Sequence, residues 1–154
     1  MQAIFNQERS FMSQLTTDEL LKQLQSADSV AKLSKYTSIL SANCGYNNFA
    51  EYITDYLKMK QISESTLIQA SQIQRTYAYQ ILNGTKNPGR EKVLALCLAA
   101  GMNYDETQRA LTLAGLGKLY PRRKEDSIVI FAIEQQLSVQ QTNELLYEEC
   151  RKTL

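Results

Sequence analysis

The chain has 154 residues, a net charge of +1 and 44% hydrophobic residues, which suits one domain of ordinary size or a small domain with helical additions. Histidine is absent, which removes the commonest general base, the usual partner of a nucleophilic Ser or Cys, and most transition-metal sites. We therefore predict no enzyme, no cofactor and no metal, and because no apolar run approaches the roughly 20 residues that span a bilayer, no membrane partner.

The N-terminal residues 1–45 predict a helical extension of a central domain. They lack the basic, apolar and small-residue regions of a signal peptide, so the expected location is the cytoplasm. Residues 16–27, TTDELLKQLQSA, predict a helix with Thr16 or Thr17 as N-cap and leucines on one face. Residues 28–40 predict a second helix, and the turn-rich segment SANCGYNN at 41–48 connects the extension to the central domain.

Residues 46–117 predict a central domain of five short helices. The first three are NFAEYITDYLKMK, SESTLIQAS with Ser63 as N-cap, and QIQRTYAYQILNG, in which Gln74 precedes the helix. Gly84 follows the third helix and is expected in a left-handed conformation. After the turn at Pro88, the segments REKVLALCLAAG and NYDETQRALTLAG predict the last two helices, each ending at a glycine.

Residues 118–154 predict a C-terminal helical tail. We expect helices at about 123–136 and 138–151, the second capped by Ser138. The run 128–133 is β-branched enough for a strand, but no other segment offers a partner strand, which favours a buried helix and an all-α fold. The cluster YPRRK at 120–124 fits either a phosphate-contacting loop or a solvated connection.

A family resemblance is densest from Ser63 to Pro88. Two short helices with a tight connection form the helix-turn-helix pattern, and LIQASQIQRTYAYQILNG followed by TKNP resembles the Xre/Cro phage-repressor type of this motif. The resemblance covers about residues 48–115 and implies a lambda-repressor-like bundle with additional flanking helices. Gly84, Lys86 and Pro88 match the family's Gly-x-Lys-x-x-Pro exit, with one residue of difference in the spacing to Pro. The apolar positions that lock the two helices together in the family correspond to Leu67, Ile68, Ile73, Ala78 and Ile81.

The chain departs from the family pattern at two places. Where the family often has a turn glycine it has Gln72, and a left-handed conformation there costs about 1 kcal/mol. Where the family often has Glu before the glycine exit it has Leu82 and Asn83. The resemblance is therefore more specific for fold than for function, because one fold serves many functions.

Positive charge collects around this motif, which bears on its partner. Residues 58–92 carry six basic and two acidic side chains, a net charge of +4, whereas the segments on either side are net acidic. The first turns of the second motif helix enter the major groove, where Arg can bond guanine, Gln can bond adenine and Thr offers a methyl or hydroxyl group. The resemblance thus implies contacts to double-stranded DNA by Gln74, Arg75, Thr76, Tyr79, Gln80, Lys86 and Arg90.

Two functions stay open from the sequence. The first is a bacterial or phage transcription regulator that binds specific DNA as a homodimer, with the N-terminal extension and the C-terminal helices as candidate dimerisation surfaces. The second is a protein-binding module, such as an antitoxin, inhibitor or adaptor, that keeps the scaffold without binding DNA. Glu64, whose carboxylate would face a phosphate, and the tyrosines favour the second function, since tyrosine often anchors interfaces. Tyr77 and Tyr79 also fit simple packing on the preceding helix.

Overall fold

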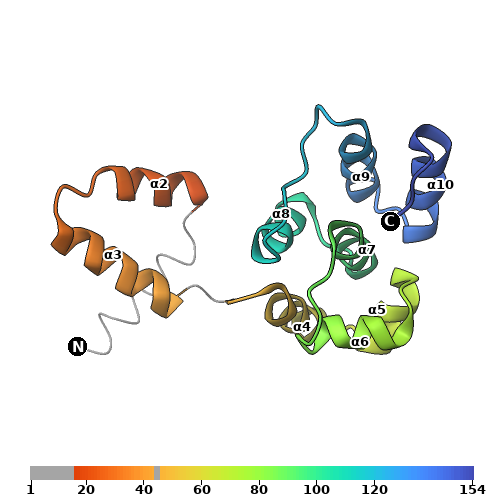
Figure 1. Cartoon of the computed structure of the whole chain (residues 1–154), viewed down its shortest axis with the longest axis horizontal. Helices are drawn as coiled ribbons and strands as arrows, with labels where there is room; N and C mark the ends of the chain where they lie inside the picture. The colour runs from red at the N-terminus through yellow and green to blue at the C-terminus, as the bar shows by residue number, and fades with distance from the viewer. Residues whose placement is uncertain (1–15, 44–45) are drawn as a thin grey trace. The chain divides into compact units, whose positions relative to one another are not determined.

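The computed structural model describes residues 16–43 and 46–154, and every regular element in these ranges is a helix (Figure 1). This confirms the predicted all-α fold, including a helix rather than a strand over residues 128–133. Residues 1–15 of the predicted extension and residues 44–45 of its predicted connection lie outside the described residues. The chain divides into two compact units, Met1–Gly45 and Tyr46–Leu154.

The first unit contains two described helices, α2 (Thr17–Gln25) and α3 (Val30–Asn43). A capping box starts α2: the Thr16 hydroxyl oxygen accepts a hydrogen bond from the Glu19 N–H, and the Glu19 carboxylate accepts one from the Thr16 N–H. Thr16 is thus the N-cap, one of the two alternatives that the sequence left open. No residue of α2 is buried, so its leucine face has no cover within the described residues.

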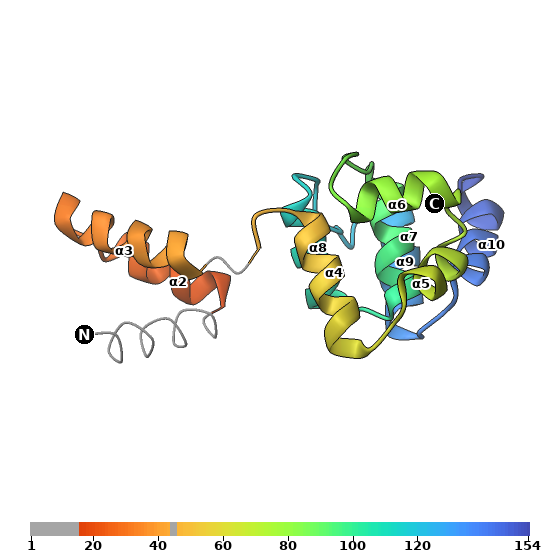
Figure 2. The same ribbon diagram turned by 90° about the horizontal axis from the view of Figure 1, so that it is seen from below.

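The second unit is arranged around one central helix. Its elements are α4 (Phe49–Lys60), α5 (Glu64–Ser71), α6 (Arg75–Leu82), α7 (Arg90–Ala100), α8 (Tyr104–Leu113), α9 (Lys124–Glu134) and α10 (Val139–Cys150). Residues 93–98 of α7 are all buried, as expected for a helix that is apolar on every side. α7 contacts α5, α8, α9 and α10, so the predicted C-terminal tail shares the core of the central helices (Figures 1 and 2).

Four connections in the second unit repeat the same local conformation. Each begins with a residue at positive φ, continues with an apolar residue packed on the core, and ends with a residue whose side chain caps the next helix. The four are Gln61-Ile62-Ser63, Gln72-Ile73-Gln74, Gly101-Met102-Asn103 and Gln136-Leu137-Ser138. Glycine adopts positive φ without steric cost, whereas each glutamine carries about 1 kcal/mol of strain. The core contact and the cap hold the three glutamine turns in this conformation.

Candidate nucleic-acid interface

The corner between α5 and α6 is where the sequence predicts a helix-turn-helix. Gln72 has a φ of 58°, the left-handed conformation considered for this turn. The buried Ser71 hydroxyl donates to the Ile68 carbonyl at 2.8 Å and accepts from the Ile73 N–H at 3.3 Å, which fixes the chain on both sides of Gln72. The five apolar positions assigned to the lock between the helices are all buried: Leu67, Ile68, Ile73, Ala78 and Ile81.

The first turn of α6 presents polar side chains to solvent and no acidic residue. Gln74, Arg75 and Thr76 are exposed, as a groove-reading face requires, whereas Tyr79 and Gln80 are half-buried. The Arg75 guanidinium lies 5.7 Å from the centroid of the Tyr79 ring, a cation–π contact that holds both side chains on one side of the helix. The partial positive charge of the helix N-terminus adds to that of Arg75. This turn therefore favours an electronegative partner.

Gln74 has a structural role besides its exposed position. Gln74 precedes α6, as predicted, and its Oε1 also accepts a hydrogen bond from the Tyr77 N–H at 2.9 Å and so caps the helix. The capping bond uses the carbonyl end of the side chain. The NH₂ group makes no part of this bond, so it is the end of the side chain that we expect to donate to a partner.

An open hollow of about 610 Å³ lies beside this turn. It is lined from α5 by Ser65 and Gln69, from the connection by Gln72, and from α6 by residues that include Arg75 and Tyr79. Arg75 is the one charged residue along it, and the amides of three glutamines supply most of its hydrogen-bonding groups. Ser65, Gln69 and Gln72 were not among the predicted site residues. They are four and then three residues apart, a spacing that places polar side chains on one face of a helix.

Lys86 lies just beyond the end of α6. Gly84 has a φ of 81°, which confirms the predicted left-handed exit from the helix. The Lys86 N–H then donates to the Gln80 carbonyl at 3.0 Å, so the backbone folds back onto the last turn of α6. The Lys86 side chain is exposed. It is thus anchored through its backbone while its ammonium group faces solvent.

Arg90 is engaged inside the protein instead of being presented to a partner. Its Nη1 and Nη2 donate to the two carboxylate oxygens of Asp126 at 2.8 and 2.9 Å. Its Nε and Nη2 also donate to the carbonyls of Gly117 and Lys118 at 3.0 and 3.1 Å. These bonds join the start of α7 to the start of α9 and occupy most of the guanidinium donors. We therefore leave Arg90 out of the candidate interface.

The carboxylate of Asp126 is buried, with 1% of the residue exposed, and stays charged. Burial acts to raise the pKa of Asp126, but the hydrogen bonds from Arg90 and from the Tyr120 N–H outweigh burial and bring the pKa below its usual value. The sequence could not reveal this ion pair, because its partners lie 36 residues apart.

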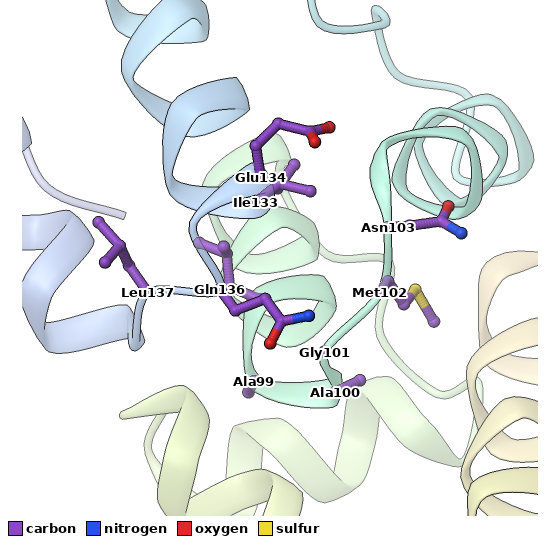
Figure 3. A pocket seen from close by; sticks show the side chains of 10 residues that line it. Ala99, Ala100, Gly101, Met102, Asn103, Ile133, Glu134, Gln136 and Leu137 are labelled. Carbon is purple, nitrogen blue, oxygen red and sulfur yellow. The ribbon is translucent and has the colours of Figure 1, made fainter.

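A second groove, of about 450 Å³, lies between the ends of α7 and α9 (Figure 3). Gly101, Met102 and Asn103 line it from one corner, and Glu134 and Gln136 from another. Glu134 is the single titratable side chain along this groove. In residues 16–43 and 46–154, no three His, Cys, Asp or Glu side chains are grouped so that they could hold a metal ion. The groove thus offers no pair of acid and base groups.

Within the described part of the chain, no helix is long and apolar enough to cross a bilayer.

Comparisons with known proteins add no further evidence on the interface. No protein-family model, curated protein or solved structure matches this chain. The resemblance to the Xre/Cro type of helix-turn-helix therefore rests on the residues of this chain alone.

Proposed function

We propose that this protein is a sequence-specific DNA-binding regulator with a lambda-repressor-like helix-turn-helix, in which the first turn of α6 enters the major groove. The observation that supports this most is the exposed, acid-free start of α6, where Arg75 stands between Gln74 and Thr76 beside an amide-lined hollow. Arg can bond guanine N7 and O6 with two hydrogen bonds, which distinguishes this base from the others. Arg75 is thus the proposed main determinant of sequence preference.

The two glutamine candidates, the exposed Gln74 and the half-buried Gln80, differ in what they can read. The carbonyl oxygen of Gln74 accepts the hydrogen bond that caps α6. We therefore expect its NH₂ group to donate to base acceptors such as guanine N7 or thymine O4. Bidentate bonding of adenine needs both ends of an amide, and this role is left to Gln80. We expect a preferred site that contains guanine opposite the start of α6.

Backbone phosphates supply the second part of the proposed interface. Lys58, Lys60 and Lys86 are exposed and come from the segment with the net charge of +4. Glu64 lies exposed at the start of α5, but Lys58 borders the same small hollow as Glu64 and offsets its charge. Such contacts position a protein on DNA without reading its sequence.

A protein-binding module is the second candidate, and one observation favours it. The hollow beside α6 has apolar as well as polar walls, because Ile68, Ile73 and the Tyr79 ring border it. A side chain from a protein partner would find both kinds of contact there, and tyrosine is enriched in such interfaces. In this case Arg75 and Tyr79 would contact the protein partner.

Selection of bound duplexes from a random DNA pool tests the proposal, followed by titration of the selected site at several salt concentrations. We expect one enriched sequence and an affinity that falls linearly on logarithmic axes as salt rises, because bound phosphates release counterions. Failure to enrich any sequence at low salt, together with capture of a protein partner that Arg75→Ala abolishes, would establish the second candidate instead.

A further inference from the structure

The connection between α8 and α9 carries positive charge that the helix-turn-helix does not use. We call residues 117–123 the basic loop. They include Lys118, Arg122 and Arg123 and no acidic residue, and these three side chains are exposed. The sequence allows either a phosphate-contacting loop or a solvated connection here, and the contacts of the loop distinguish the two.

The backbone of the basic loop is held in place by side chains from two helices. Arg90 of α7 donates to the carbonyls of Gly117 and Lys118 at 3.0 and 3.1 Å. The Gln108 amide of α8 accepts from the Leu119 N–H at 2.7 Å and donates to the Leu119 carbonyl at 3.1 Å. The Leu119 side chain is itself buried. The loop is therefore preorganised, so that binding a partner costs little conformational entropy.

These bonds leave the charged ends of the loop side chains unused. Lys118 is held through its carbonyl oxygen, and within residues 16–43 and 46–154 neither its ammonium group nor the Arg122 guanidinium forms an ion pair. Arg123 lies 3.9 Å from the Glu125 carboxylate, but Lys152 contacts the same carboxylate more closely, at 2.8 Å. Lys118 and Arg122 are thus free to bind an anionic partner.

The acidic residues next to the loop do not cancel its charge. Three of them line the small hollow at the start of α7 and α9, namely Glu91, Glu125 and Asp126. Asp126 is paired with Arg90, and Glu125 with Lys152. Glu91 is thus left against the three cations of the basic loop, which gives this end of the unit a local excess of positive charge.

The basic loop lies next to the connection from α6 to α7, which carries Lys86. Arg90 begins α7 directly after this connection, and its bonds to the loop place the two segments side by side, toward the end at which α7 begins (Figure 2). Lys86 precedes Arg90 by four residues, so their Cα atoms are at most about 14 Å apart. Successive phosphates of one DNA strand rise about 3.4 Å along the helix axis. A strand that passes Lys86 thus brings further phosphates within reach of Lys118.

We propose that the basic loop is a second phosphate-contacting element, in which Lys118 and Arg122 bind the backbone of double-stranded DNA next to the part that α6 contacts. Arg and Lys side chains are common ligands of DNA phosphates, and such contacts position a protein without reading its sequence. Arg90 is then a positioning residue, because it holds the loop and not the phosphate. The proposal rests on the proposed function for its partner, but it concerns the backbone of any duplex and requires no base reading.

Fluorescence anisotropy of the full chain with the selected duplex and with a random duplex of the same length, at several salt concentrations, tests the basic loop. The test variant is Lys118→Gln with Arg122→Gln, which keeps the hydrogen bonds that hold the loop because they use its backbone atoms. Both affinities should fall by a similar factor, at least about tenfold. The slope of log affinity against log salt should become shallower by about 1.8, since each lost phosphate contact contributes about 0.9.

Lys22→Gln with Lys32→Gln is the matched control. These changes remove two exposed cations from α2 and α3, so the net charge of the protein falls by the same amount. Both affinities and the salt slope should stay at their wild-type values. Equal losses for the control and the test variant would overturn the proposal, because net charge alone would then explain them.

The remaining outcomes separate the basic loop from the proposed function. A selected site whose affinity and salt slope the loop variant leaves unchanged would overturn the proposal and leave the proposed function standing. Enrichment of no sequence, together with binding to random duplexes that the loop variant weakens, would do the reverse. A loss confined to the selected site would contradict the phosphate contact, and absence of binding to any duplex at low salt would overturn both.

Discussion

The α5–α6 and α9–α10 corners have nearly the same backbone but differ in charge, because α5 and α6 carry one acidic and one basic side chain whereas α9 and α10 carry six acidic and one basic. Gln72 and Gln136 occupy equivalent places, with φ of 58° and 52°, and each is followed by an apolar residue and a capping residue. An arginine also lies over a tyrosine ring at each second helix: Arg75, at the start of α6, over Tyr79 at 5.7 Å, and Arg151, just after the end of α10, over Tyr147 at 5.2 Å. Backbone geometry therefore cannot distinguish the two corners.

Their acidic residues do distinguish them. α6 has no acidic side chain, whereas α10 carries Glu144, Glu148 and Glu149. Glu149 also forms an ion pair with Lys124 of α9, with 3.2 Å between Oε2 and Nζ, and this pair joins the two helices. The first turn of α10, like that of α6, has no acidic residue, so the difference lies in the rest of the helix, which makes the α9–α10 pair less suited to phosphate. A corner of this backbone geometry thus indicates DNA binding only where the exposed residues permit it. The following predictions use the α9–α10 corner as an internal control.

The largest expected effect concerns the ion pair that joins the start of α9 to the start of α7. Asp126→Asn should lower the free energy of unfolding by about 2–3 kcal/mol, because it leaves Arg90 without its buried carboxylate. Urea unfolding measures this loss. The neighbouring change Glu125→Gln, which breaks a more exposed pair with Lys152, should cost much less. Folded Asp126→Asn protein should keep its DNA affinity, and loss of affinity would return Arg90 to the interface.

The same ion pair predicts a pH dependence with a definite sign. The folded-state pKa of Asp126 lies below its usual value of 3.8, so the stability from this group is present above that value. It is lost as the pH falls through the folded-state pKa. The free energy of unfolding of the wild type should therefore exceed that of Asp126→Asn at neutral pH but not in strong acid. Urea unfolding from pH 7 to about pH 2 measures this difference. A difference that stays constant over this range would show that the protonation of Asp126 is not linked to folding.

Arg90 also shows which part of the fold and of the site the sequence can predict. The caps at Thr16, Ser63 and Ser138 were predictable because each is a preferred capping residue that bonds a backbone N–H only three residues further along. The cap at Gln74 was not predicted, because glutamine is not a preferred capping residue. The ion pair of Arg90 and the packing of α9 and α10 on α7 depend on contacts between distant residues, which local patterns do not encode. Local patterns likewise predicted the exposed first turn of α6, but the hollow beside it needs two helices to form.

Removal of one arginine from each corner tests the comparison directly. Arg75→Gln should weaken binding to the selected site by about 1–3 kcal/mol and binding to random DNA much less, because the guanine contact is lost. Arg151→Gln removes the same charge and the same kind of contact with a tyrosine just after the end of α10, and it should change neither affinity. Fluorescence anisotropy with labelled duplexes measures both. Equal losses for the two variants would mean that only the net charge matters.

Lys86→Ala should have a smaller effect of a different kind. It removes a phosphate contact, so the selected site and random DNA should both weaken by about 1 kcal/mol, and the slope of log affinity against log salt should become shallower by about 0.9. Titrations at several salt concentrations give both values. A loss confined to the selected site would assign Lys86 to base reading instead.

The smallest expected effect compares two of the three left-handed glutamines, Gln72 and Gln136. Gln72→Gly and Gln136→Gly should each raise the free energy of unfolding by about 0.5–1 kcal/mol, because relief of backbone strain exceeds the added flexibility of the unfolded chain. Thermal melts should show a small, similar gain for both variants. Their effects on DNA should differ, since Gln72 lines the hollow beside Arg75 and Gln136 lies in the acidic corner. Gln72→Gly alone should then alter affinity for the selected site. If both variants bind DNA like the wild type, the hollow is not part of the DNA contact, and the interface reduces to the first turn of α6 and its flanking lysines.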